Sequence, residues 1–438
     1  MLSSQLHILR RAPARYRHAN GGEGSGGYDH QVNVVFIEPA FPANQREFVR
    51  GLASVGATVV GIGERPFDHL DADLRGWMLH YEQIGNVTDV GQLGGAVRRV
   101  QERLWVDRLE ATIESHTLAA AEVREQCSIP GTSLRTAYLC RDKPSMKQVL
   151  RDAGVPCAES TAAHSAGEVF AFAERVGYPL ILKPRAAAGA SGTRRVDDSN
   201  ALQRALADIG AEGAYSVAVE EFVEGHEGFY DTICVSGQPV YDFISHYYPN
   251  VLEAMRERWI SPQFIATNRV DTAASYAEVR SLGKRAIDVL GIETSATHME
   301  WFFGPKGLRF SEIGCRPPGV RAWDLYAVGN DIDIYCEWAR AVLYGAVDAP
   351  LSRRLAAGIV ALRPDHDGHI SHYEGADVIQ ERYGPHIIDA YLPSPGTPTQ
   401  PVEAGYMANA WVRMAHPDYD LLRGMLNDVG ETLRVRAA

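Results

Sequence analysis

The sequence predicts a fold that joins an α/β unit to α+β lobes, and three observations support this. From Asn33 onward, buried strands alternate with amphipathic helices. Residues 155–228 follow the order strand, helix, strand, loop, helix, strand, and residues 298–316 have the pattern of a β-hairpin. The 438 residues are 45% hydrophobic and 22% charged, which is an ordinary globular composition and enough for two to four domains.

Residues 31–135 have the pattern of a Rossmann-like domain. NVVFIEP and ATVVGIG are apolar runs that predict strands, and an amphipathic helix lies between them. A further strand around residues 109–113 ends before Glu114, at a strand end where open α/β sheets bind ligands; a surface turn is the alternative. Residues 1–30 are basic and then glycine-rich, without the apolar core of a signal peptide, and we expect them to be disordered.

Composition argues against several classes of function. A formal net charge of −12 argues against sequence-independent nucleic-acid binding and does not favour an anionic membrane. The six cysteines are widely spaced without a C-x-x-C pair, which argues against a disulfide scaffold and fits a reducing compartment. No apolar stretch approaches the roughly 20 residues that span a bilayer. We therefore expect a cytoplasmic protein whose partners are small molecules.

The segment 178–231 carries the first candidate binding site. YPLILKP predicts a strand that ends on Lys183, and a lysine desolvated in this way needs an anionic partner. The following loop, RAAAGASGTRR, is rich in small residues, so backbone N–H groups near Ser191 and Gly192 can surround phosphate oxygens. An ordinary flexible hairpin is the alternative. No G-x-x-x-x-G-K-[ST] motif occurs, which argues against a P-loop protein.

Two neighbouring stretches extend this site. Lys143 stands at a predicted helix start, where a cation opposes the helix dipole unless it points at an anion. VAVEEFVEGHE predicts a strand with Glu227 after its turn, and this carboxylate can accept from ribose hydroxyls. Glu220 can accept from the amino group of adenine. The strand ends on four residues whose backbone groups can meet the edge of the base: Glu220, Glu221, Phe222 and Val223.

Glu300 and Glu312 flank a Gly-Pro-Lys-Gly turn, which predicts a β-hairpin. A connection from Gly304 to Leu308 would place the two glutamates opposite each other on one face, whereas a connection one residue shorter would place them on opposite faces. Facing carboxylates repel unless a cation lies between them, and Mg²⁺ is the expected ion. An exposed hairpin with scattered acids is the alternative. Arg316 would follow on the same face and reach a phosphoryl or carboxylate group.

The C-terminal part predicts strands, turns and a final amphipathic helix. His366, His369 and His372 invite a zinc interpretation. They lack a matching cysteine or an H-E-x-x-H spacing, so a loop with solvated histidines is the better interpretation.

The order and spacing of these pieces resemble the ATP-grasp superfamily. RDKPSMK, LILKP, the small-residue loop, VEEFVEG and HMEW…FSEIGCRPPG carry the resemblance, which extends from residue 31 to about residue 438. The chain looks like the carboxylate–amine ligase branch, close to L-amino-acid ligases and biotin-carboxylase-like folds. The resemblance implies an ATP-grasp fold with four parts: a Rossmann-like domain (31–135), a small ATP-binding lobe (136–228), a large lobe with the metal site (229–345) and a C-terminal lobe (346–438).

The resemblance also implies ATP, one or two Mg²⁺ ions with Mn²⁺ as the alternative ion, and a homodimer. Carried over to this sequence, the nucleotide contacts would be Lys143, Lys183, residues 220–223 and Glu227, the metal ligands Glu300 and Glu312, and the catalytic residues Lys183 and Arg316. Glu114, His298 and Arg321 are candidates for contact with substrates. The family usually has an asparagine two residues after the second glutamate; this chain has Gly314, so water would complete the second metal site.

These features predict an ATP-dependent ligase. A carboxylate resists attack by an amine until it is activated, here as an acylphosphate formed at the γ-phosphate of ATP. An amine then displaces phosphate and gives an amide or a dipeptide, while the small-residue loop closes to keep water out. Two alternatives stay open: a carboxylase of the same fold that uses bicarbonate, and a catalytically silent ATP-binding protein, which Gly314 suggests.

Overall fold

The computed structural model describes residues 31–184, 193–211, 217–255, 257–402 and 409–438. Residues 32–438 form one compact unit. The expected disorder of residues 1–30 and the expected phosphate contacts of Ser191 and Gly192 fall outside the described residues. Among the helices that are described, none is long and apolar enough to cross a membrane.

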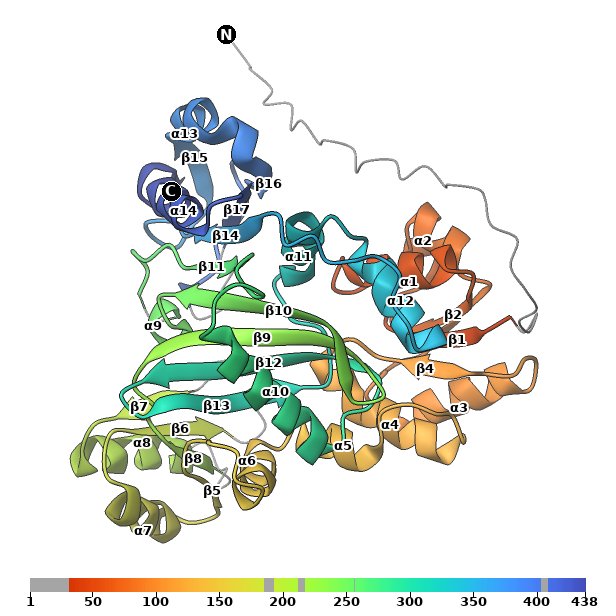
Figure 1. Cartoon of the computed structure of the whole chain (residues 1–438), viewed down its shortest axis with the longest axis horizontal. Coiled ribbons are helices and arrows are strands. Elements are labelled where there is room, and N and C mark those ends of the chain that lie inside the picture. Colours follow the sequence, from red (N-terminus) through yellow and green to blue (C-terminus); the bar gives the residue numbers. More distant parts are fainter. Residues whose placement is uncertain (1–30, 185–192, 212–216, 256, 403–408) are drawn as a thin grey trace. The chain divides into compact units, whose positions relative to one another are not determined.

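A four-stranded parallel sheet with the order β3-β2-β1-β4 forms the N-terminal part, which has the predicted Rossmann-like arrangement (Figure 1). Its strands are largely buried because helices cover them. The strands are β1 (Asn33–Ile37), β2 (Thr58–Gly63), β3 (His80–Gln83) and β4 (Arg108–Glu110). The helices are α1 (Gln45–Ser54), α2 (Ala72–Trp77), α3 (Val90–Gln101) and α4 (Thr117–Gln126), with short 3-10 turns at Phe67–His69 and Glu114–His116.

A second, antiparallel sheet has the order β5-β8-β6-β7 and a core of its own on the face that α7 and α8 cover (Figure 1). Helices α5 (Leu134–Leu139) and α6 (Lys143–Asp152) precede it. The strands are β5 (Ser160–Ala163), β6 (Leu180–Pro184), β7 (Arg194–Val196) and β8 (Val217–Glu221); the helices are α7 (Ala166–Val176) and α8 (Ser199–Ala211). The strand that we predicted from residue 155 begins only at Ser160.

The largest sheet has eight antiparallel strands in the order β13-β12-β9-β10-β11-β14-β17-β16. Strands from the predicted large lobe and from the predicted C-terminal lobe therefore share one sheet. These strands are β9 (His226–Val235), β10 (Gln238–Tyr248), β11 (Gln263–Ala266), β12 (Ser295–Gly304), β13 (Gly307–Gly314), β14 (Ala356–Leu362), β16 (Ile387–Tyr391) and β17 (Ala410–His416). The helices beside it are α9 (Val251–Ala254), α10 (Tyr276–Leu290), α11 (Ala322–Asn330) and α12 (Ile334–Tyr344).

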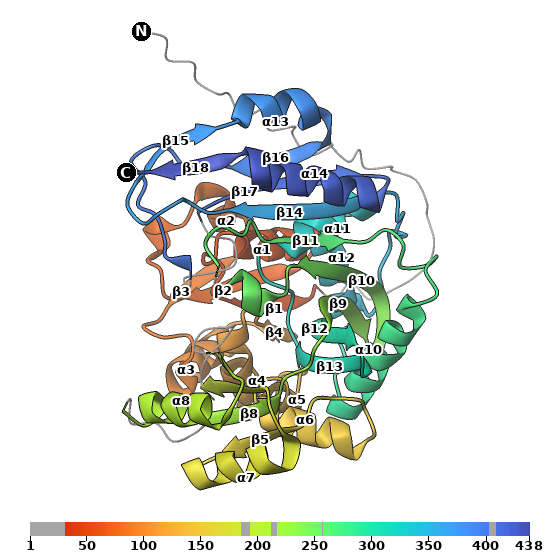
Figure 2. The same ribbon diagram turned by 90° about the vertical axis from the view of Figure 1, so that its left-hand side faces the viewer.

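The C-terminal residues add a helix and a small sheet that we did not predict. A two-stranded sheet pairs β15 (Ile370–Glu374) with β18 (Arg434–Ala437), and α13 (Ala376–Tyr383) precedes a 3-10 turn at Gly384–His386. The predicted amphipathic helix is α14 (Tyr419–Thr432), but the chain ends on β18 beyond it (Figure 2).

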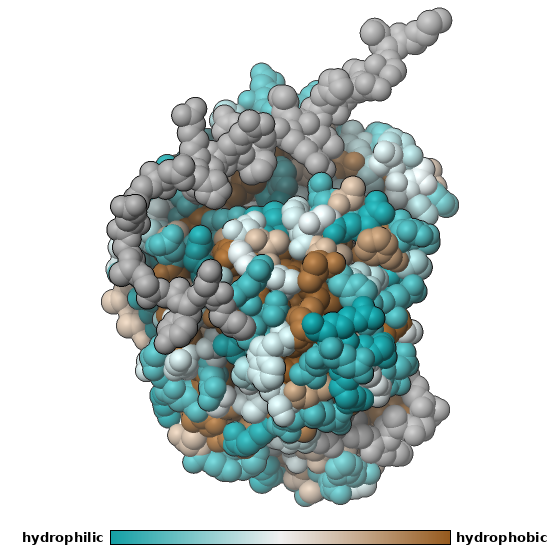
Figure 3. Space-filling model, turned by 90° about the vertical axis from the view of Figure 1, so that its right-hand side faces the viewer, coloured by the Kyte–Doolittle hydropathy of each residue, from teal (hydrophilic) through white to brown (hydrophobic). Residues whose placement is uncertain are grey.

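Large hydrophobic side chains reach the surface at separate places. Trp105, Leu79 and Trp259 are 70%, 68% and 76% exposed and belong to different parts of the chain. On the face drawn in Figure 3, exposed hydrophobic residues form separate patches between hydrophilic ones. Scattered exposure of this kind does not identify a partner surface, and the expected homodimer stays a prediction.

Helices α1 and α12 pack closely, which joins the N-terminal sheet to the large lobe. Gly51 allows this approach, because a Cβ atom there would lie 2.5 Å from the carbonyl oxygen of Tyr335 in α12. On one side of the contact, Arg50 binds Asp333 through two nitrogens at 2.8 and 3.0 Å. The contact therefore combines backbone proximity with an ion pair.

Gly51→Ala should destabilise the protein by about 1–3 kcal/mol, because the added methyl group forces the helix backbones apart. The matched control is Gly76→Ala in α2, where a Cβ atom would meet nothing within 4 Å; it should be neutral or stabilise by up to about 1 kcal/mol. Urea denaturation of both variants measures the difference. Equal effects would show that α1 and α12 do not pack as described.

Two neighbouring histidines, buried His246 and half-buried His226, lie on the face of the largest sheet that α10 covers. His226 Nε2 lies 2.9 Å from His246 Nδ1, and His246 Nε2 lies 2.7 Å from the Tyr276 hydroxyl of α10. Burial, and then the neighbouring His226 and Arg423, lower the pKa of His246 from its ordinary 6.5 to about 3. Burial also lowers the pKa of His226. Both rings are therefore neutral at neutral pH.

Because His246 takes up a proton near pH 6.5 in the unfolded chain and only near pH 3 in the folded protein, its contribution to stability should be full above pH 6.5 and fall as the pH drops toward 3. His246 should contribute a slope of about 1.4 kcal/mol per pH unit within this range. Denaturant unfolding at several pH values should give a shallower slope for His246→Gln than for wild type. His366→Gln, whose side chain is 57% exposed, should keep the wild-type slope; identical slopes for all three proteins would contradict this account.

Candidate active site

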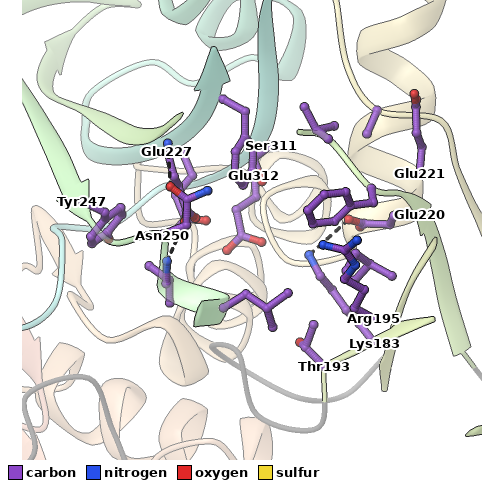
Figure 4. A pocket seen from close by; sticks show the side chains of 18 of the residues that line it. Lys183, Thr193, Arg195, Glu220, Glu221, Glu227, Tyr247, Asn250, Ser311 and Glu312 are labelled. Carbon is purple, nitrogen blue, oxygen red and sulfur yellow. Dashed lines mark hydrogen bonds and ion pairs between the residues drawn. The ribbon is translucent and has the colours of Figure 1, made fainter. Parts of the chain in front are cut away.

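A cavity of about 520 Å³ is lined by residues of both antiparallel sheets and by helices α6 and α9 (Figure 4). Among the described residues, three lysines, one arginine and seven glutamates contribute to its wall. The lysines are Lys143, Lys147 and Lys183, and the apolar part of the wall includes Ile181, Phe222, Val223, Phe302 and Phe310. The cavity thus combines a charged region with an apolar one, as ligand sites commonly do.

On the small-lobe side, two lysines share one carboxylate. Lys147 Nζ of α6 and Lys183 Nζ of β6 lie 2.8 and 3.1 Å from the same Oε2 atom of Glu220 in β8. Burial would raise the pKa of Glu220, but the two lysines hold it well below its usual range. Its other oxygen, Oε1, is buried and has no hydrogen-bond partner among the described residues. The carboxylate of Glu220 is therefore held by lysines, whereas we expected it to be open to a base.

On the large-lobe side, Glu300 and Glu312 lie directly opposite each other, as we predicted. Gly304 pairs with Gly307, so the connection is the shorter of the two that we considered, and our expectation that it would place the glutamates on opposite faces was wrong. A β-bulge restores the register: Trp301 pairs with Phe310 and Glu300 with Glu312, so Ser311 is the extra residue between them. Both carboxylates reach the cavity wall.

Lys143, at the start of α6, forms an ion pair with Glu312. Asp142 caps the helix by accepting from the backbone N–H of Ser145, which fixes the helix start beside the hairpin. Burial would raise the pKa of Glu312, but Lys143 and then Lys183 hold it at about 2. Lys143 therefore supplies the counter-charge that we expected from a metal ion.

Glu227, at the start of β9, adds a third carboxylate beside this pair. Its Oε2 accepts from the backbone N–H of Val251 at 2.7 Å, and its backbone N–H donates to the side-chain oxygen of Asn250 at 3.0 Å. Burial, and then the neighbouring Glu300, raise the pKa of Glu227 to about 8. In Figure 4, Glu312 reaches between Glu227 and Asn250 on one side and Lys183 and Glu220 on the other. This end of the cavity carries excess negative charge.

The apolar end is formed by residues that follow β8. The guanidinium of Arg195 lies 4.3 Å from the ring centre of Phe222, and both residues line the cavity with Val223. Glu221 pairs with Lys306 from the turn of the hairpin. The end of β8 is thereby joined to the hairpin that carries Glu300 and Glu312.

Arg316 does not line the cavity. It follows β13, and its Nε and Nη2 donate to Glu114 Oε2 at 3.0 and 2.7 Å. Sequence analysis singled out both residues, and the structure brings them together as an ion pair between the N-terminal part and the hairpin. A Cβ atom at Gly314 would be in ordinary contact with Arg316 Cγ at 3.4 Å, so the arginine occupies space beside that glycine.

The remaining candidates are also outside the cavity wall. His298 Nδ1 lies 2.7 Å from Asp231 Oδ1, and its Nε2 lies 3.7 Å from Glu300 Oε1. Burial lowers the pKa of His298, but the ion pair with Asp231 outweighs burial and raises it to about 9. Arg321 is 47% exposed and pairs with Asp324 at 2.6 Å. His298 is thus adjacent to the carboxylate pair, whereas Arg321 binds within its own helix start.

Sequence analysis missed Lys147, although the motif RDKPSMK contains it. Its position four residues after Lys143 places both lysines on one face of α6, and this spacing was the available signal. Asn250 was also missed, because no local pattern marks it. In the part of the chain that the structure describes, no group of three or more His, Cys, Asp or Glu residues could hold a metal ion, and this includes His366, His369 and His372.

Comparison with known proteins gives matches to an ATP-binding domain family and to an amino acid ligase. The profile of a family described as "Carbamoyl-phosphate synthase L chain, ATP binding domain" matches residues 142–229. An L-arginine-specific L-amino acid ligase from Bacillus subtilis is 25% identical over 250 residues, which cover 56% of this chain and 59% of that ligase. The chain spans less than two thirds of the first two curated relatives that it matches, at 59% and 64% of their lengths.

Two solved structures resemble the whole fold. The L-amino acid ligase from Bacillus licheniformis matches with a TM-score of 0.74 at 15% identity, over 94% of this chain and 100% of that chain. The biotin carboxylase domain of 2-oxoglutarate carboxylase from Hydrogenobacter thermophilus, solved with MgADP, ADP and bicarbonate, matches with a TM-score of 0.67 at 18% identity. That match covers 93% of this chain and 91% of that chain.

A Rossmann-like part, a small antiparallel lobe and a large antiparallel sheet, with a charged cavity lined from the last two, define the class of ATP-grasp folds. The predicted fold class is confirmed. Residues 142–229 match that ATP-binding domain family, and the chain has the ATP-grasp fold.

Proposed function

We propose that this protein is an ATP-dependent ligase. It would activate a small-molecule carboxylate, an amino acid in the first instance, as an acylphosphate and join it to an amine, with release of ADP and phosphate. The likeness to two amino acid ligases supports the substrate class. The observation that carries the proposal is the convergence of three lysines and two facing glutamates, from separate parts of the chain, on one cavity.

The residues present fit magnesium and a triphosphate. Glu300 and Glu312 offer hard carboxylate oxygens on adjacent strands, which is the donor type that Mg²⁺ prefers together with phosphate oxygens and water. The ion pair between Lys143 and Glu312 would exchange partners when the nucleotide enters. Lys143 would then bind phosphate, and Glu312 would be free for the metal. Gly314 provides no side-chain ligand, so water would complete a second metal position.

The first chemical step would transfer the γ-phosphoryl group to the substrate carboxylate. Lys143 and Lys183 would hold the phosphate oxygens and offset the charge that moves toward ADP. Bound Mg²⁺ would supply further neutralisation of this charge. Residues 220–223 would meet the adenine beside the apolar wall, and Glu227 would accept from ribose.

The second step would join the acylphosphate to an amine, with phosphate as the leaving group. This step needs a cavity closed to water, because water also attacks an acylphosphate. The part of the small-residue loop that contains Ser191 and Gly192, from which we expected this closing role, lies outside the described residues. Arg316 could stabilise the transferred phosphate only if its ion pair with Glu114 opens. Glu114, His298 and Arg321 remain proposals for the substrate side.

A screen for ADP release tests the function. The protein, ATP and Mg²⁺ should release ADP with amino acids supplied singly or in pairs, and mass spectrometry should detect an amide or dipeptide. Bicarbonate-dependent phosphate release without a coupled product would favour the carboxylase alternative. Tight ATP binding without ADP release across the screen would favour a silent nucleotide-binding protein and contradict the ligase.

Lys183→Met should lower kcat/KM for ADP release by about 100-fold or more, because it removes a charged donor from the transferring phosphate. Lys284→Met is the matched control, since Lys284 pairs with Asp288 one helical turn away on α10. Steady-state kinetics of both variants measure the effect. Similar kcat/KM values for the two variants would show that Lys183 does not contribute to the site.

Glu300→Gln should raise the Mg²⁺ concentration needed for half-maximal ADP release by about tenfold or more, because it weakens the carboxylate pair. The exposed Glu278→Gln in α10 should leave the magnesium dependence unchanged. Titration of Mg²⁺ at saturating ATP provides the measurement. An unchanged requirement in Glu300→Gln would place the metal elsewhere.

A further inference from the structure

Lys147 is a buried lysine that no part of the proposed mechanism uses. Its side chain is 2% exposed, and its ammonium group lies 2.8 Å from Glu220 Oε2. Complete burial of an ammonium group is unfavourable unless a counter-charge compensates it. Burial accordingly lowers the pKa of Lys147, although Glu220 opposes this shift. Because burial of this cation is unfavourable, we expect Lys147 to have a role other than packing.

The charge of the cluster supplies that reason. Two positive charges, on Lys147 and Lys183, lie within about one hydrogen-bond length of the same oxygen of Glu220, which carries one negative charge. Either lysine alone would neutralise Glu220. With both present, one positive charge is left over at the cavity wall, where water is scarce and the charge interacts strongly with an anion.

The two lysines differ in what they can reach. The side chain of Lys183 is 21% exposed, whereas that of Lys147 is 2% exposed, and both belong to the cavity wall. Figure 4 shows Lys183 joined to Glu220 beside the cavity. Lys183 can therefore meet a ligand directly, while Lys147 lies behind it on α6. The inner lysine neutralises the carboxylate, and the outer lysine keeps its charge.

We propose that Lys147 is a positioning residue that neutralises Glu220, so that the positive charge of Lys183 stays available to the phosphate oxygens of a nucleoside triphosphate. The inference rests on the proposed function, because it assumes that a triphosphate occupies this cavity. In this proposal Glu220 orients the side chain of Lys183, in addition to any contact that Glu220 makes with the base. It also explains why α6 carries two lysines on one face.

The first test is the affinity for a non-hydrolysable β,γ-imido analogue of ATP with Mg²⁺, measured by isothermal titration calorimetry. In Lys147→Met, Glu220 pairs with Lys183 alone and cancels its charge, so the dissociation constant should rise about tenfold or more. Lys147→Arg keeps the charge and should stay within about threefold of wild type. Lys284→Met, a surface lysine of the same charge, should bind like wild type.

The decisive variant is Lys147→Met combined with Glu220→Gln. It removes both inner charges and leaves the cation of Lys183 uncancelled, so the affinity should recover to within about threefold of that of Glu220→Gln alone, in which any contact of Glu220 with the base is equally lost. A merely structural role for Lys147 predicts no such recovery. Thermal unfolding without nucleotide shows which variants are folded. The double variant leaves only the part-exposed cation of Lys183 at this place, and it still decides the matter if Lys147→Met does not fold.

The outcomes separate this inference from the proposed function. If wild type does not bind the analogue with Mg²⁺, the proposed function itself fails. If wild type binds and folded Lys147→Met binds equally well, only the role of Lys147 is overturned. If the double variant binds about tenfold or more weakly than Glu220→Gln alone, Lys147 does not act through Glu220 and the inference is likewise overturned.

Discussion

Charge buried around a small cavity must be balanced, and this constraint organises the candidate site. On the small-lobe side, two lysines meet one carboxylate, which leaves positive charge over. On the large-lobe side, Lys143 balances Glu312, but Glu227 and Glu300 stand close together and the pKa of Glu227 rises to about 8. The small-lobe end therefore needs an anion, and the large-lobe end needs a cation. A ligand that brings both phosphate groups and a cation would balance the two ends together.

The fold brings these charges together from distant parts of the sequence. Helix α6 presents Lys143 and Lys147, the small-lobe sheet presents Lys183 and Glu220, and the hairpin of β12 and β13 presents the facing glutamates. The bulge at Ser311 is as important as the strands, because without an extra residue the short turn would pair Glu300 with residue 311. Lys306 then joins the tip of the hairpin to Glu221. Local geometry and long-range pairing therefore define the cavity jointly.

Much of this could be predicted from the sequence because the signals are local. Apolar runs and caps marked β1, α1, β6 and α6 closely, and the order of motifs predicted the ATP-grasp fold. Pairing partners could not be predicted in the same way. Arg316 and Glu114 are about 200 residues apart in sequence, and only the docking of the N-terminal part on the hairpin makes them partners.

The errors have similar physical causes. The sequence left the length of the hairpin connection open. The consequence expected for the shorter connection was wrong because a bulge leaves no reliable trace in composition, and Ser311 looks like any polar strand residue. Lys147 was overlooked because a lysine on a helix is usually solvated, and its burial depends on the sheet that packs against α6. The shared sheet of the large and C-terminal parts depends on the pairing of β11 with β14, about 90 residues further along the chain.

The most direct test of the account is a crystal structure of the protein with the β,γ-imido analogue of ATP and Mg²⁺. We expect phosphate oxygens within hydrogen-bonding distance of Lys143 and Lys183, and a metal ion between Glu300 and Glu312 with the Lys143–Glu312 ion pair opened. A nucleotide bound elsewhere, or a triphosphate in this cavity that leaves that ion pair closed and both glutamates without metal, would contradict the account.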